Sequence, residues 1–122
     1  MIELTIISKE NKQLVKQMEE QFPKMTDNFK KLLEDEYLTF LTKQNDYGPS
    51  NISMNTQLRN EDEVRMSLAG VVTRMNDKMS RIINLIIKSK DQPKNEPIED
   101  SFKDISVYAK IARIVKAGNW AK

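Results

Sequence analysis

Four charged residues share one face of a helix that we expect over residues 61–89. Arg74, Asp77, Lys78 and Arg81 follow one another at intervals of three or four residues, which aligns them on one side of an α-helix. Arginine offers a planar fork and lysine a compact point charge, and both suit phosphate oxygens. The pattern therefore favours anion recognition. The same spacing is also typical of a solvated helix face with internal salt bridges, and both interpretations stay open.

Acidic residues follow in the next expected helix, over residues 98–117. Asp100 and Asp104 are four residues apart and lie close on the helical wheel to Val107 and Ile111. A carboxylate beside an apolar stripe must pair with a cation, bind a metal ion or lie at the solvent-exposed rim. Placement in the first turn explains Asp100 through the helix dipole, but explains Asp104 less well. If they pair with cations, the candidate partners are Arg74, Lys78 and Arg81 of the preceding helix.

A metal site is the second interpretation of these acids. Glu96, Glu99 and Asp104 could supply oxygen ligands, and Mg²⁺ often takes one or two carboxylates together with water and phosphate oxygens. The sequence requires no cofactor, and Mg²⁺ is the one cofactor that remains possible.

Asp46 and Tyr47 fall in a segment expected to be irregular, over residues 45–60, where they would present a carboxylate and a flat ring to a ligand.

Two absences narrow the chemistry further. The 122 residues contain no cysteine and no histidine, which excludes thiol nucleophiles, Ser-His pairs and zinc sites of the Cys/His type. A net charge of +2 is too small to predict general DNA binding. The sequence shows neither an apolar run of membrane-spanning length nor a signal peptide, so we expect no membrane association and a cytoplasmic location.

The apolar pattern predicts an all-α fold, a single domain over residues 1–122 resembling a four-helix bundle. Expected helices cover residues 9–21, 27–44, 61–89 and 98–117, after a short extended arm at residues 2–7. Pro23 should end or bend the first helix, residues 90–97 should form a polar linker and residues 119–122 a tail. A bundle of this size often self-associates, so we also expect a homo-oligomer. In the third helix, the expected apolar face comprises Leu68, Val72, Met75, Met79, Ile82, Ile83 and Ile86.

Three segments in this order resemble the nucleotide modification associated domain 1 family, which occurs mostly in phages and prophages. They are KQNDYG at residues 43–48, RMNDKMSRIINL at residues 74–85 and EPIEDSFKDISVYA at residues 96–109. The resemblance covers roughly residues 29–115 and implies a helical protein of phage nucleotide metabolism, located in the host cytoplasm if phage-encoded. It places the family's characteristic polar positions on Asp46, Tyr47, Arg74, Asp77, Lys78, Arg81, Glu99, Asp100, Asp104 and Tyr108.

A looser likeness is to all-α nucleoside triphosphate pyrophosphohydrolases of the MazG type, which hold Mg²⁺ with paired acidic motifs. Here Asp100 and Asp104 are four residues apart rather than three, and the neighbouring helix offers cations where carboxylates are needed.

We carry three functional hypotheses. The first is a non-catalytic binder of a nucleotide or other phosphate-bearing molecule. It would serve as an accessory in nucleotide modification or as a trap for a nucleotide signal, such as one of host defence. Its ligand would be held by Asp46, Tyr47, Arg74, Asp77, Lys78, Arg81, Asp100, Asp104 and Tyr108. The second is a Mg²⁺-dependent nucleotide hydrolase, and the third is a helical module that binds a partner protein.

Overall fold

The computed structural model describes residues 7–88 and 97–122, and in these ranges the chain is all-α. The five helices are α1 (Lys9–Gln21), α2 (Pro23–Tyr47), α3 (Ser50–Ser53), α4 (Glu61–Lys88) and α5 (Ile98–Lys116). The chain divides into two compact units, residues 1–41 and 42–122, and α2 runs from the first into the second. The all-α prediction is therefore confirmed. The extended arm expected over residues 2–7 lies almost wholly outside the described residues, as does most of the linker over residues 90–97.

The first unit contains α1 and most of α2. The Ser8 hydroxyl caps α1 by accepting a hydrogen bond from the Asn11 backbone N–H. Pro23 begins α2 one residue after α1 ends, with Phe22 between them, so α2 starts four residues earlier than expected. Proline suits the first position of a helix, where no intrahelical partner exists for a backbone N–H. Within the first turn of α2, the Thr26 hydroxyl donates to the Phe22 carbonyl at 3.0 Å.

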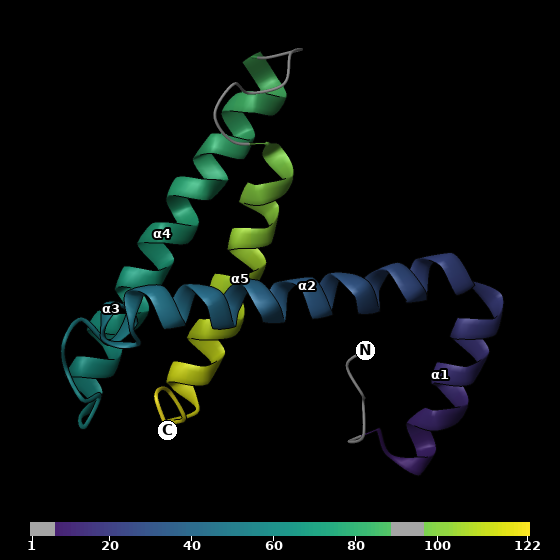
Figure 1. Cartoon of the computed structure of the whole chain (residues 1–122), viewed down its shortest axis with the longest axis horizontal. Helices are drawn as coiled ribbons and strands as arrows, with labels where there is room; N and C mark the ends of the chain where they lie inside the picture. The colour runs from purple at the N-terminus through teal and green to yellow at the C-terminus, as the bar shows by residue number, and fades with distance from the viewer. Residues whose placement is uncertain (1–6, 89–96) are drawn as a thin grey trace. The chain divides into compact units, whose positions relative to one another are not determined.

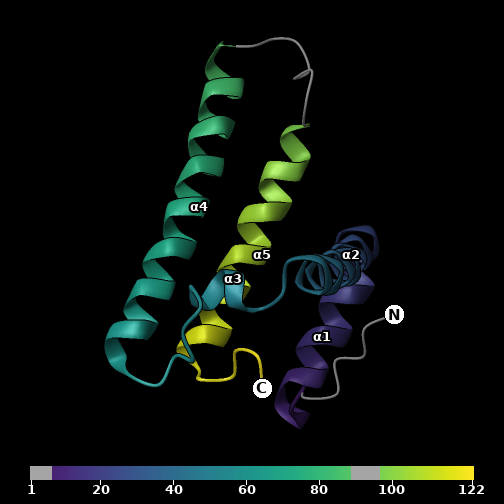
Figure 2. The same cartoon turned by 60° about the vertical axis from the view of Figure 1, so that its left-hand side comes forward.

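The second unit is built on α4 and α5. Figures 1 and 2 both show these two helices side by side and antiparallel. Asn60 caps α4, because its side-chain oxygen accepts from the Glu63 N–H at 2.9 Å. Gly118 ends α5 with a φ of 78°, and the N–H groups of Gly118 and Asn119 close the last turn on the carbonyls of Val115 and Ile114.

The segment expected to be irregular, residues 45–60, is partly helical. Residues 45–47 belong to α2, and α3 follows two residues later and packs against α4. The Ser67 hydroxyl of α4 donates to the Ile52 carbonyl of α3 at 2.7 Å, and both residues are buried. The C-terminal tail is also packed rather than loose. Trp120 is buried, and its indole N–H donates to the Pro49 carbonyl at 2.9 Å.

The core of the second unit lies between α3, α4, α5 and Trp120. Its buried apolar side chains are Ile52, Val71, Ile82, Val107, Ile111, Val115 and Trp120. The apolar stripe expected for α5 is confirmed at Val107 and Ile111, and the buried Val115 extends it. In the first unit the outcome differs, since no residue of α1 or α2 is buried.

Candidate functional site

The face of α4 that meets the core is not the face that the apolar pattern predicts. Ser67, Val71 and Ile82 are the buried residues of α4, and of these only Ile82 belongs to the expected stripe. Val72 and Ile86 are 59% and 65% exposed. The buried side of α4 is rotated about the helix axis by roughly a quarter of a turn from the predicted apolar stripe. Polar side chains on the buried side contact α3 and α5, so this side faces inward.

The three cations of the predicted stripe, Arg74, Lys78 and Arg81, lie along this inward side of α4 and are half-buried. Their contacts are specific. Arg74 donates to both the backbone and the side-chain oxygen of Asn51 in α3, at 3.3 and 3.2 Å. Arg81 donates to the hydroxyl of Ser101 in α5 at 2.8 Å. This stripe is therefore not a fully solvated face. The expected pairing of an α5 acid with an α4 cation is confirmed at Asp104 and Lys78, whereas the Arg81 contact goes to a serine that was not predicted.

Asp104 binds two lysines from two other helices. Lys43 of α2 contacts one carboxylate oxygen at 3.0 Å, and Lys78 of α4 contacts the other at 2.9 Å. The Asp104 side chain is only 13% exposed, whereas Lys43 keeps 44% of its side-chain surface exposed. One carboxylate thus holds two ammonium groups at the border between core and solvent. All three residues belong to the second unit.

The lysines control the ionisation of Asp104. Burial alone would raise the pKa of the carboxyl group, because it penalises the charged form. The hydrogen bonds from Lys78 and Lys43, together with their positive charge, outweigh this effect and lower the pKa below its usual value. Asp104 is therefore ionised at neutral pH and keeps both lysines in place.

Arg81 and Ser101 form a second contact beside the first. Arg81 follows Lys78 by three residues in α4, and Ser101 precedes Asp104 by three residues in α5. In antiparallel helices these offsets place the two contacts about one turn apart. We call this group the Asp104 cluster; it consists of Lys43, Lys78, Arg81, Ser101 and Asp104.

The other predicted ligand residues have different positions. Asp46 and Tyr47 lie in the last turn of α2, not in a loop, and both are exposed. Asp77 and Asp100 are exposed as well, so Asp100 does not share the partly buried position of Asp104. Tyr108 is half-buried on α5.

Within residues 7–88 and 97–122, the acidic side chains do not come together as the metal hypothesis requires. No three acidic side chains of these ranges come together in a group that could hold a metal ion. Both oxygens of Asp104 contact lysines, and Glu99 is exposed. Glu96 lies outside the described residues.

Sequence reasoning missed two members of the cluster. Lys43 carries a signal in retrospect, because a wheel of α2 places it on the same side as Met25, Phe29 and Leu32. A lysine on an apolar face usually has a partner for its charge. Ser101 carries no such signal, since a serine in the first turn of a helix is common.

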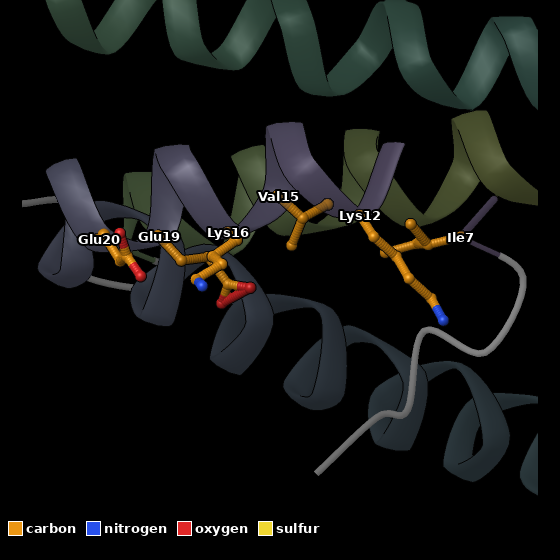
Figure 3. A pocket seen from close by; sticks show the side chains of 6 residues that line it. All are labelled: Ile7, Lys12, Val15, Lys16, Glu19 and Glu20. Carbon is orange, nitrogen blue, oxygen red and sulfur yellow. The ribbon is translucent and has the colours of Figure 1, made fainter. Parts of the chain in front are cut away.

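A separate hollow of about 440 Å³ lies on α1 in the first unit. Figure 3 shows its charged lining, Lys12, Lys16, Glu19 and Glu20, with Ile7 and Val15. Two lysines and two glutamates cancel in charge, so the lining of this hollow has no excess of positive charge.

These features define an all-α protein with a cation-rich cluster between two antiparallel helices. No family model, no curated protein and no solved structure matches the chain. The resemblance to the nucleotide modification associated domain 1 family therefore stays a prediction. Among the described helices, none has the length and apolar character needed to span a membrane.

Proposed function

We propose that the protein binds a phosphate-bearing ligand, most plainly a nucleotide, at the Asp104 cluster. The observation that carries the proposal is the convergence of Lys43 and Lys78 on the single carboxylate of Asp104, with Arg81 one turn away. The two ammonium groups and the guanidinium outnumber the carboxylate of the cluster. A phosphate placed beside them would meet several cationic donors at once.

Half-burial favours this role over that of an ordinary surface patch. Exposed lysines are well hydrated and must be ordered on binding, which costs side-chain entropy. Here Asp104 and Ser101 already fix the cations. A ligand would therefore bind to groups that need little rearrangement, in surroundings where charge interactions are stronger than in bulk water.

The nucleotide part of the proposal rests on the resemblance and on Tyr47. This tyrosine is 71% exposed at the end of α2, four residues after Lys43. An exposed aromatic ring can stack on a base without being specific for one sequence or base type. In a phage setting, such a binder would serve nucleotide modification as an accessory, or would sequester a nucleotide signal.

Binding is proposed without catalysis. A metal-dependent hydrolase needs several carboxylates around its ion, and no such group gathers in the described part of the chain. Asp104 is the one carboxylate of the cluster, and its lowered pKa makes it a weak base at neutral pH.

Isothermal titration calorimetry with mono-, tri- and cyclic nucleotides, with and without Mg²⁺, tests the proposal. We expect a dissociation constant in the micromolar range for at least one nucleotide. Lys78→Gln and Arg81→Gln should each weaken it about tenfold, equal to about 1.4 kcal/mol. Arg65→Gln is the matched control, because it removes one positive charge from an exposed part of the same helix, and it should leave affinity unchanged.

Two results would contradict the proposal. One is no binding of any nucleotide at micromolar protein concentration. The other is an equal loss of affinity in Arg65→Gln, which would show a non-specific charge effect. Phosphate and pyrophosphate release is measured in parallel. Turnover that Asp104→Asn abolishes would replace the binding proposal with the hydrolase alternative.

A further inference from the structure

The outer face of α4 carries a regular apolar seam that no described residue of the second unit covers. The exposed residues at heptad positions a and d are Ala69, Val72, Asn76, Met79, Ile83 and Ile86. Their spacing alternates between three and four residues, which is the pattern of a surface that binds another helix. We call these six residues the outer seam. It runs roughly 26 Å along the helix at 1.5 Å per residue.

The seam is distinct from the inward side of α4 described above. The inward side, with Val71 and Ile82, already packs in the core of the second unit, and Lys78 and Arg81 contact α5. Apolar side chains as exposed as Ile86, at 65%, are common singly on a surface. A continuous line of exposed apolar side chains in heptad register is uncommon and indicates a contact surface.

We propose that a second copy of this chain covers the outer seam, with the two α4 helices parallel and in register. Asn76 is the reason for choosing a second copy. It is the one polar residue of the seam and holds an a position, where an apolar partner helix would leave its amide without a hydrogen-bond partner. In a parallel two-fold pair, Asn76 meets the Asn76 of the other copy, and each amide satisfies the other.

The absence of charged residues at the positions flanking the seam is compatible with pairing of two identical helices. The flanking e positions hold Thr73, Ser80 and Ile87, and the flanking g positions hold Leu68, Met75 and Ile82. None of these is charged, so two identical helices meet no like-charge repulsion along the contact. The net charge of +2 also leaves little repulsion between whole chains.

The length of the seam sets the expected strength. Stable interfaces bury about 800 Å² on each partner, and a single seam of this length falls toward the lower end. We therefore expect a reversible dimer that dissociates in the micromolar range. This inference does not rest on the proposed ligand, because the seam and the Asp104 cluster use different residues.

Sedimentation of the full chain, from about 1 to about 100 µM, tests the proposal. We expect the mass to rise from one chain to two across this range. Ile83→Lys places a charge in the seam and should weaken the association at least tenfold. Asn84→Lys is the matched control, since it adds the same charge at the next, exposed position and should leave the dimer unchanged. Asn76→Leu should strengthen association, because a buried polar a position costs stability.

Cross-linking tests the orientation. The chain has no cysteine, so Ala69→Cys and Ile86→Cys each introduce the only thiol. In the parallel pair each variant forms a disulfide with itself. A disulfide that forms only in a mixture of the two would show an antiparallel pair and overturn the proposed arrangement.

A monomer at every concentration would overturn the proposal altogether. If Ile83→Lys then lowered the melting temperature of that monomer, another part of the same chain would be the occupant of the seam. Circular dichroism of each variant confirms that the helices are retained. Ile83 is half exposed, so the lysine does not enter the core.

Discussion

Asp104 accepts hydrogen bonds from Lys43 and Lys78 with its two oxygens. A partly buried ion pair contributes more than an exposed one, but part of the gain is lost to the desolvation of the carboxylate. The net contribution of this pair to the free energy of unfolding therefore depends on the protonation state of Asp104. Measuring stability as a function of pH can detect this contribution.

The stability of the protein should fall in acid through this group. The folded-state pKa of Asp104 is lowered, so its contribution is complete above the unfolded-state value of about 3.9 and is lost as the pH falls through the folded value. Asp104→Asn should cost about 1 to 2 kcal/mol at pH 7 and progressively less as the pH falls below the unfolded-state value. Urea unfolding of both proteins at several pH values measures this difference.

Asp77→Asn, an exposed control on α4, should change stability by less than about 0.5 kcal/mol. A pH-independent cost for Asp104→Asn would show that its charge does not matter.

At the scale of the helices, the ends are set by short-range chemistry. Ser8, Pro23, Asn60 and Gly118 each stand where a helix begins or ends. Capping side chains and restricted backbone angles act within a few residues. For this reason the bounds of α1, α4 and α5 could be predicted closely. The bounds of α2 could not, because Pro23 is compatible both with the end of one helix and with the start of the next.

Two glycines on these helices should respond in opposite directions to alanine. Gly70 lies inside α4, and an added Cβ would meet only the Met54 sulfur at an ordinary contact distance of 3.5 Å. Gly70→Ala should therefore stabilise the protein by about 0.5 to 1 kcal/mol through helix propensity. Gly118 has a φ of 78°, so Gly118→Ala should destabilise it by about 1 kcal/mol. Thermal unfolding of the two variants beside the parent chain decides the signs. A loss of stability in Gly70→Ala would indicate that α4 has no room beside Met54.

At the scale of the whole molecule, the second unit is closed by its C-terminal residues. Trp120 fills the space beside α3 and donates its indole N–H to Pro49. This contact links the end of the chain to the turn after α2, 71 residues earlier. Nothing in the pattern of residues 119–122 predicts it, because a contact over that distance depends on the complete packing of α3, α4 and α5.

Removing this side chain should destabilise the second unit strongly. Trp120→Ala should cost about 3 kcal/mol, in the range of large-to-small core substitutions. Trp120→Phe keeps most of the apolar contact but loses the hydrogen bond. It should therefore cost less than Trp120→Ala, about 1 to 2 kcal/mol in total. Chemical unfolding followed by far-ultraviolet circular dichroism compares both variants with the parent chain. Equal stability of all three would mean that the tail adds nothing to the fold.

The sequence by itself determined the all-α class and the course of most helices, and it marked the cationic face of α4 as a candidate anion site. Periodicity and capping are local, so they define the faces of each helix without its neighbours. Only the tertiary structure decided which face of α4 turns inward and which is left as the outer seam. It also decided that Lys43 joins Lys78 at Asp104, across 61 residues of sequence. Both outcomes depend on which helices meet and at what rotation, and this is fixed by the sum of contacts between elements rather than by the pattern within one.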